Sequence, residues 1–155
     1  MKKIKILASG PLKFNFIRDG LEYYKNKISP FISLELIIPK IKTSGLNKEQ
    51  KLIKEEKVLR KYLSPKDYLI ILDERGKMLK SIELARHLEK ILEIHDSLCF
   101  IIGGPEGISK NLKNEAQEIL SLSSLTLNHE IALLMLLEAI YRSFTIIKKF
   151  PYHRE

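Results

Sequence analysis

The amino-acid sequence predicts an α/β protein in which a parallel β-sheet is flanked by helices. Its clearest segment is Leu98–Ile102, a run of five residues without a charge that leads directly into Gly103-Gly104-Pro105-Glu106-Gly107. A short uncharged apolar run bounded by glycine and proline is typical of a strand buried on both faces, as in parallel sheets. Along the chain, strand patterns of this kind alternate with amphipathic helical patterns, which is the order of elements that builds a parallel sheet.

The first 46 residues are predicted to contain a strand, a helix, a second strand and a basic loop. The first strand is Lys3–Ala8, which the turn cluster Ser9-Gly10-Pro11 ends. From Leu12 to Ile28, apolar residues recur at intervals of three and four, which predicts a helix with one buried face. The second strand is Ser33–Ile38, and the basic loop is Lys40–Leu46.

The middle of the chain begins with a lysine-rich helix. Asn47, with Gln50 three residues later, resembles a capping box, so this helix is expected to start there and to end at Leu63. The third strand is Asp67–Leu72, which is apolar on both faces. The polar residues that follow, Asp73-Glu74-Arg75-Gly76, are predicted to form a loop.

The remaining elements continue the alternation of helices and strands. In order they are a helix capped by Ser81 and ending near His95, the strand 97–102, a helix from Ser109 to about Glu118, a strand from Leu120 to Leu127 and a helix from Glu130 to Lys149. The fifth strand is predicted because apolar and hydroxyl residues alternate along it.

The final helix is apolar around nearly its whole circumference. Its apolar residues are Ile131, Leu133, Leu134, Met135, Leu136, Leu137, Ile140, Tyr141, Phe144, Ile146 and Ile147. A helix of this kind has to be buried on all sides. We expect one side to pack on the chain's own sheet and another side, which includes Leu137, to meet a second copy in a homodimer. Complete burial inside one subunit is the alternative.

Length and composition predict a single domain over residues 1–155. A hydrophobic content of 45% with 30% charged residues is ordinary for a globular protein. The lone cysteine, Cys99, excludes an internal disulfide, and no apolar run approaches the roughly 18 residues of a membrane span. The basic and then apolar start is too short for a signal peptide and is interrupted by Lys5. These features predict a cytoplasmic protein.

Positive charge is concentrated in the first part of the chain. Residues 1–66 carry 16 Lys and Arg against 6 Asp and Glu, whereas residues 67–155 carry 11 against 13. This asymmetry favours a surface that faces a polyanion such as nucleic acid. A compositional bias is the alternative, because 21 of the basic residues are lysines.

The sequence lacks the motifs of metal sites and of common nucleotide sites. One cysteine and four scattered histidines offer no ligand spacing, so no metal is expected. Neither a Walker loop, a G-x-G-x-x-G after the first strand nor a nucleophile elbow is present. Instead, residues 73–76, 103–107 and 124–130 follow predicted strands. Because ligands of open α/β sheets bind at the carboxyl ends of the strands, these segments are predicted to line one pocket.

Four segments in this order resemble a known family: FIIGGPEG, SLSSLTLNHE, EAIYRSF and the final PYHRE. Over the whole chain they are similar to the ribosomal RNA large subunit methyltransferase H family of the SPOUT superfamily. The resemblance implies a deep C-terminal trefoil knot, which ordinary connection rules argue against. It also implies that a homodimer uses S-adenosylmethionine to methylate N3 of a pseudouridine in a 23S ribosomal RNA stem-loop, a step in ribosome maturation.

The resemblance assigns S-adenosylmethionine to residues near the ends of three predicted strands. They are Leu72, Gly103, Leu122, Ser123, Ser124, Leu125, Thr126 and Leu127. Apolar side chains can hold an adenine while exposed backbone groups read its edge, and Gly103 would let the backbone approach the cofactor. The hydroxyl residues can instead serve ordinary turn chemistry. Relatives often carry Pro or Ser where this chain has Asn128-His129-Glu130, and Glu130 would bring a negative charge near the RNA entrance.

Methyl transfer to the pseudouridine requires an oriented nucleophile and removal of its imide proton. The candidate catalytic residues are Arg142, His153 and Arg154, and the candidate substrate contacts are His129 and Tyr152. The resemblance suggests that the tail of one subunit completes the site of the other. Alternatively, Arg142 only pairs with Glu138 four residues earlier, and the terminal histidine is only solvated.

Three other functions remain open from the sequence. The chain can be a SPOUT-like methyltransferase acting on another RNA, or a non-enzymatic basic RNA-binding protein. The glycine-rich loop by itself also fits a flavodoxin-like protein that binds a small molecule. Binding of S-adenosylmethionine argues against the non-enzymatic alternative, and selective binding to ribosomal particles argues against the small-molecule alternative.

Overall fold

The structure, a computed structural model, describes residues 1–154 and contains a five-stranded sheet flanked by helices. In chain order the elements are β1 (Lys3–Ala8), α1 (Asn15–Ile28), β2 (Ser33–Ile37), α2 (Lys48–Arg60), β3 (Asp67–Met78), α3 (Ser81–Ile94), β4 (Ser97–Ile102), α4 (Lys110–Glu115), β5 (Glu118–Ser121) and α5 (His129–Ile147). The strand order is β2-β1-β4-β3-β5, and every pairing is parallel. The predicted α/β architecture with a parallel sheet is confirmed.

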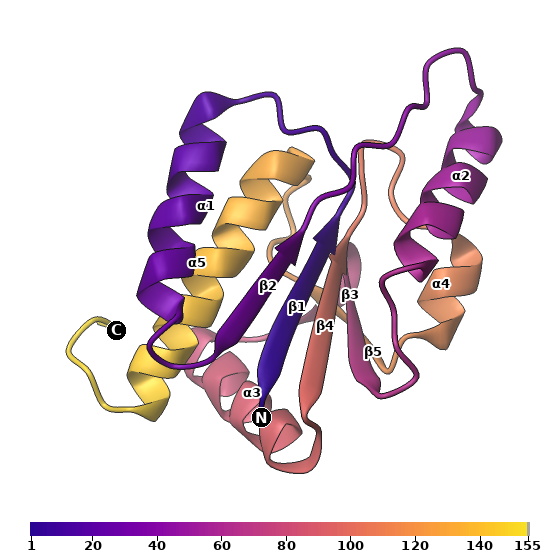
Figure 1. Cartoon of the computed structure of the whole chain (residues 1–155). Coiled ribbons are helices and arrows are strands. Elements are labelled where there is room, and N and C mark those ends of the chain that lie inside the picture. Colours follow the sequence, from indigo (N-terminus) through magenta and orange to yellow (C-terminus); the bar gives the residue numbers. More distant parts are fainter. Residues whose placement is uncertain (155) are drawn as a thin grey trace.

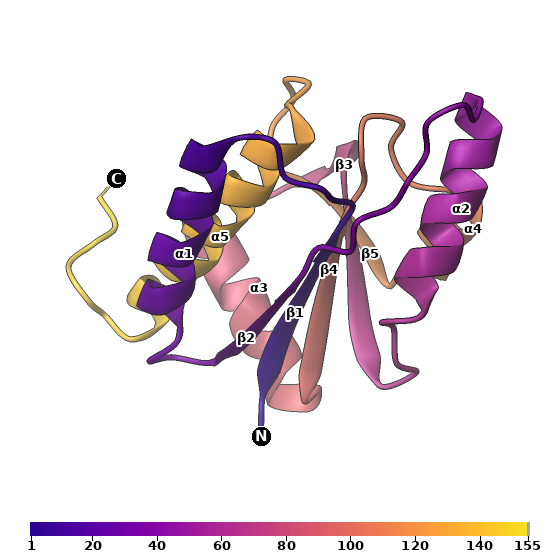
Figure 2. The ribbon, with the colours of Figure 1, turned by 45° about the horizontal axis from the view of Figure 1, so that its top comes forward.

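Helices cover both faces of the sheet (Figures 1 and 2). α1, α3 and α5 lie on one face, with α5 in contact with both of the others, whereas α2 and α4 lie on the opposite face. In β4, Leu98 and Phe100 pack toward the α5 face, and Cys99 and Ile101 pack toward the α2 face. Because both faces are covered, all six residues of β4 are buried. The uncharged run in the sequence therefore has its predicted role.

A buried ion pair ties together the amino ends of the central strands. Lys5 Nζ lies 2.7 Å from Asp67 Oδ2, and the two side chains are 7% and 3% exposed. The Ser97 hydroxyl donates to Asp67 Oδ1 at 2.6 Å, and the Ser64 amide donates to Oδ2 at 2.8 Å. Burial alone would raise the pKa of Asp67, but the hydrogen bonds from Lys5, Ser97 and Ser64 lower it. The carboxylate of Asp67 is therefore ionised at neutral pH. Because Lys5 is buried beside it, Lys5 is no part of the basic surface.

The predicted loop 73–76 is wrong, because β3 continues through these residues to Met78. Its pairing with β5 is interrupted after Leu72 and resumes at Lys77, and both residues are in register with Leu120. Gly76 packs so closely on β5 that a Cβ there would lie 2.7 Å from the carbonyl oxygen of Ile119. Turn-like composition suggested a loop that ends the strand, but residues 73–76 form an unpaired bulge, after which the strand continues because Lys77 and Met78 pair again with β5.

Several predicted boundaries also change. Ser81 is the first residue of α3 and not its cap, since the Lys80 amide preceding it donates to Glu83 Oε1 at 2.8 Å. α4 ends at Glu115, β5 covers only residues 118–121, and residues 122–127 have no regular structure. The capping box of Asn47 and Gln50 is confirmed at the start of α2.

α5 packs against α1, α3 and β4, so its own chain covers it on all but its outer side. Leu137 is fully buried in the core, so the prediction that it faces outward is wrong. The exposed apolar residues of α5 are instead Ile131 and Met135, which are 43% and 38% exposed. An amphipathic pattern cannot show which side of an all-apolar helix the chain itself covers, because every side has the same composition.

Two further sequence features can be compared with the structure. Cys99 is buried as predicted, and its burial raises the pKa of the thiol to about 12. Within residues 1–154, the helices are too short or too polar to cross a membrane.

Candidate functional site

A pocket of about 300 Å³ opens at the carboxyl edge of the sheet, where β3 and β4 meet the irregular segment 122–127. It is lined by seven of the eight residues predicted to bind the cofactor: Leu72, Gly103, Leu122, Ser123, Leu125, Thr126 and Leu127. Ser124 is exposed and does not line the pocket. His129, at the start of α5, also contributes to the lining. The structure thus brings together three segments that are separated in the sequence.

The Gly103–Gly107 loop is a tight turn whose glycines are required by its own packing. The Gly107 amide donates to the Gly104 carbonyl at 2.9 Å, and Gly107 has a φ of +84°. A Cβ at Gly103 would lie 2.4 Å from the carbonyl oxygen of Gly107 and 2.7 Å from Ile108 Cγ1. We expected Gly103 to be needed for the approach of a ligand, but its first role is to let the turn close.

The hydroxyl side chains of the pocket are engaged by the chain itself. The Leu125 amide donates to Ser123 Oγ at 2.9 Å, and Thr126 Oγ1 donates to Glu74 Oε2 at 2.6 Å. The contact between Leu125 and Ser123 fits the turn chemistry considered from the sequence. The contact between Thr126 and Glu74 holds the irregular segment 122–127 against the extended end of β3.

Charged residues of β3 also fix the pocket wall. Lys113 Nζ of α4 lies 2.6 Å from Asp73 Oδ2. Burial alone would raise the pKa of Asp73, but the hydrogen bond from Lys113 lowers it. The carboxylate is therefore ionised at neutral pH. In residues 1–154, no group of three His, Cys, Asp or Glu side chains has the arrangement of a metal site.

α2 supports the Gly103–Gly107 loop from behind. Glu55 is only 8% exposed, accepts a hydrogen bond from the Ser9 hydroxyl, and has Oε2 only 2.9 Å from where a Cβ on Gly104 would stand. At the other end of the loop, Ser109 Oγ donates to Glu56 Oε1 at 2.5 Å. Sequence reasoning missed Glu55. The sequence does contain one indication of its burial: Glu55 lies four residues before the buried Leu59, and residues four apart share one face of a helix.

Glu130 is buried and is not at an RNA entrance, which corrects the expectation from the sequence. It is 1% exposed and accepts hydrogen bonds from the amides of Lys13 and Phe14, at 3.0 Å and 3.2 Å. These amides immediately precede α1 and need an acceptor. Asn128 caps α5, since its Oδ1 accepts from the Glu130 amide at 2.9 Å.

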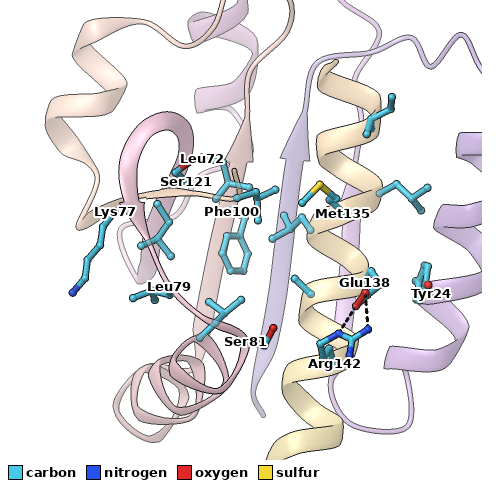
Figure 3. A pocket seen from close by; sticks show the side chains of 17 residues that line it. Tyr24, Leu72, Lys77, Leu79, Ser81, Phe100, Ser121, Met135, Glu138 and Arg142 are labelled. Atoms are coloured by element: carbon cyan, nitrogen blue, oxygen red, sulfur yellow. Dashed lines mark hydrogen bonds and ion pairs between the residues drawn. The ribbon is translucent and has the colours of Figure 1, made fainter. Parts of the chain in front are cut away.

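A second cavity of about 440 Å³ lies among α1, α3, α5 and the sheet (Figure 3). Its α5 lining includes Met135, Glu138 and Arg142, which Figure 3 shows along one side of the helix. Leu72 and Leu122 line both cavities. Although this cavity is larger, it contains neither the glycine-rich loop nor His129, so we assign ligand binding to the smaller pocket.

The C-terminal tail folds back on Arg142. Arg142 Nε lies 2.8 Å from Glu138 Oε1, Nη1 lies 3.1 Å from His153 Nδ1, and the guanidinium carbon lies 4.6 Å from the Tyr152 ring centre. The hydrogen bond to Glu138 raises the pKa of Arg142. Because a guanidinium only donates, His153 Nδ1 accepts, and the proton of the neutral ring is on Nε2.

Of the other tail residues, Tyr152 is partly buried and Arg154 is exposed. Burial, with a hydrogen bond to Tyr24, raises the pKa of Tyr152 to about 12, so this phenol is neutral. Glu155, the last residue of the recognised PYHRE segment, lies outside the described residues.

The tail cluster and the pocket lie at opposite ends of α5. Arg142 lies thirteen positions after His129, which corresponds to about 20 Å of helix. Figure 1 shows the tail leaving α5 at the end distant from the carboxyl edge of the sheet. Within one chain the structure therefore assembles two partial sites: His129 with the pocket, and Arg142 with Tyr152 and His153.

Comparison with known proteins gives the family to which this chain, with its parallel sheet and glycine-rich pocket, belongs. Residues 1–153 match the family model described as "Predicted SPOUT methyltransferase". The chain therefore belongs to the SPOUT methyltransferase family, as the sequence motifs indicated.

Individual relatives are similar over nearly their whole length and carry one name, "Ribosomal RNA large subunit methyltransferase H". The protein of Maridesulfovibrio salexigens is 40% identical over 99% of this chain and 99% of its own. The protein of Pseudothermotoga lettingae is 37% identical over 97% of this chain and 99% of its own. The protein of Parabacteroides distasonis is 36% identical, again over 99% of both chains.

Proposed function

We propose that this protein transfers a methyl group from S-adenosylmethionine to N3 of a pseudouridine in a 23S ribosomal RNA stem-loop, in the cytoplasm. The observation that carries the proposal is the glycine-rich pocket, which seven of the eight motif positions line together with His129. The name that the relatives of this protein share, "Ribosomal RNA large subunit methyltransferase H", supports ribosomal RNA as the substrate. The proposal includes one domain over residues 1–155 and a C-terminal trefoil knot, which is the fold that membership of the SPOUT family implies.

The pocket residues fit S-adenosylmethionine. The walls include the apolar Leu72, Leu122 and Leu127, and the loop at Gly103 and Gly104 presents backbone without side chains. A volume of about 300 Å³ is at the lower end of small-molecule pockets. When bound, the cofactor supplies an activated methyl group on a sulfonium. The chain's own residues have to hold the nucleotide in line with it and exclude water.

The tail residues supply the groups that the imide requires. Arg142 stays cationic beside Glu138 and stabilises the anion that remains when the imide proton passes to solvent water. His153 presents Nε2–H, which donates a hydrogen bond to a base oxygen. Tyr152 stacks on the unpaired base, and Arg154 binds a phosphate. His129 contacts the nucleotide at the rim of the pocket.

These roles require a homodimer, because the two partial sites lie at opposite ends of α5. The exposed Met135 stands near the midpoint between His129 and Arg142. Two α5 helices crossing antiparallel about a two-fold axis at Met135 place the tail cluster of one chain beside His129 of the other. The apolar cavity along α5 gives the partner a surface to cover.

Wild-type protein is expected to run at twice its 18.0 kDa mass in light scattering. Met135→Lys should give a folded monomer, because two ammonium groups would meet at the two-fold axis without partners. Ile53→Lys is the matched control, since Ile53 is 62% exposed on α2, on the other face of the sheet. A monomeric wild type, or a Met135→Lys protein that stays dimeric, would contradict this assembly.

Glu55→Ala is expected to weaken S-adenosylmethionine binding at least about tenfold. The Ser9 hydroxyl loses its buried acceptor, and the loop at Gly104 loses the side chain that packs against it. Calorimetry measures the affinity, and thermal melting measures stability. Glu55→Gln, which keeps an acceptor for Ser9, should recover most of the binding. Glu49→Gln on the exposed side of α2 is the control. Equal affinity in Glu55→Ala and wild type would exclude this support.

Methylation itself is tested on ribosomal RNA from a strain that lacks the gene. Purified protein and S-adenosylmethionine are incubated with this RNA, with the large subunit and with assembled ribosomes, and the RNA fragments are analysed by mass spectrometry. A methylated pseudouridine in one 23S fragment is expected. Methylation of a different RNA, or RNA binding without methylation, would favour the alternatives and refute the proposal.

A further inference from the structure

The outer surface of α2 and its flanking turns carries lysines with few acidic neighbours. The exposed lysines of residues 40–66 are Lys40, Lys42, Lys48, Lys54, Lys57, Lys61 and Lys66. The acidic residues of α2 are distributed differently. Glu55 and Glu56 point inward to serine hydroxyls, which leaves Glu49 as the exposed carboxylate of this helix. Folding therefore separates the charges of α2 onto two sides.

Within residues 1–154, cations of α2 that lie near the pocket loop or α4 have acidic partners, whereas those of the outer surface have none. Lys51 Nζ lies 3.8 Å from Glu106 Oε1, and Arg60 pairs with both Glu56 and Glu115. For Lys54, Lys57 and Lys61, the described part of the chain offers no carboxylate within 4.0 Å. Lys54 instead donates to the carbonyl of Lys42.

The spacing of these three lysines makes a continuous row. Positions 54, 57 and 61 are three and four residues apart, so their side chains leave one face of the helix at intervals of about 5–6 Å. α2 lies on the face of the sheet opposite to α5 (Figures 1 and 2), so a partner bound along α5 leaves the row uncovered. The inner side of the same helix contacts the pocket loop.

We propose that the row of Lys54, Lys57 and Lys61 binds phosphates of the RNA substrate outside the methylated nucleotide. This inference rests on the proposed function. Ammonium groups on flexible stems suit a phosphate backbone, because they need no fixed geometry and no base identity. The row thus supplies sequence-independent affinity and orientation, while the pocket and tail select the nucleotide. It also gives a role to three of the lysines that make the first part of the chain basic.

The test is the triple variant Lys54→Gln, Lys57→Gln and Lys61→Gln. Affinity for the ribosomal stem-loop RNA is measured by filter binding across a salt series, and methylation kinetics are measured in parallel. For three lost phosphate contacts, the slope of log affinity against log salt should fall by about 2–3. KM for RNA should rise at least tenfold, with kcat within twofold and S-adenosylmethionine affinity unchanged.

A variant with the same loss of charge elsewhere is the matched control. Lys25→Gln, Lys27→Gln and Lys90→Gln change exposed residues of α1 and α3. Unchanged slope and KM in the α2 variant, or equal changes in the control, would overturn the proposal. Unchanged RNA affinity with weaker binding to polyglutamate would assign the row to an acidic protein and also overturn it. If wild type binds RNA without methylating it, the proposed function fails while the salt slopes still test the row.

Discussion

Deletion of residues 152–155 is expected to lower methylation at least about a hundredfold, the range for loss of a positioned hydrogen-bond donor that stabilises a developing anion. Tyr152 and His153 pack on Arg142 at the end of α5 that is remote from the pocket. Their loss removes the stacking ring and the imidazole, but it leaves the residues that line the pocket intact. S-adenosylmethionine affinity should therefore stay within a few-fold of wild type. Calorimetry and methyl-transfer rates measure the two quantities separately.

A mixed dimer then shows whether the tail of one chain completes the pocket of the partner or the pocket of its own chain. One chain lacks residues 152–155, and the other carries Gly103→Val with an intact tail. Activity should return in the mixture, because the intact pocket receives its tail from the partner. Leu127→Glu, which places a charge in the apolar wall, is a second pocket-blocked chain for use if Gly103→Val does not fold. Inactive mixed dimers made from two folded parents would show that the tail works only within its own chain.

Gly103→Val is expected to abolish S-adenosylmethionine binding, with a loss of affinity above about a hundredfold. Even a single Cβ would lie 2.4 Å from the Gly107 carbonyl oxygen, which is backbone and cannot rotate away. The turn must therefore open, and it displaces the loop from the pocket edge. Because β4 ends before this residue, the sheet should remain folded.

The control for Gly103 is a glycine with free space around it. No atom lies within 4 Å of the place that a Cβ on Gly45 would take, and asparagine tolerates the left-handed φ of +82° there better than most residues. Gly45→Asn should therefore preserve binding, with only a small loss of stability from the backbone conformation. Circular dichroism and light scattering check that both variants fold and dimerise. Wild-type affinity in a folded Gly103→Val protein would show that the ligand binds elsewhere.

Sequence alone determined the features that depend on neighbouring residues. β4 and the Gly103–Gly107 turn followed from one uncharged run and its glycines, since burial on both faces leaves no place for a charge. The capping box of α2 was equally local, because Asn47 and Gln50 bond to each other's backbone. The motif positions of the pocket were also found from the sequence, through their resemblance to a family.

Only the tertiary structure decided which residues far apart in the chain meet. β3 extends past Leu72 because β5 pairs with it, and no local pattern records that partner. Glu55 and Glu130 look like surface carboxylates until Ser9 and the Lys13 amide, 46 and 117 residues away, supply their hydrogen bonds. The rigid length of α5 separates His129 from Arg142 in the same way. A sequence specifies such distances only through the whole fold, because each depends on contacts that many other residues make together.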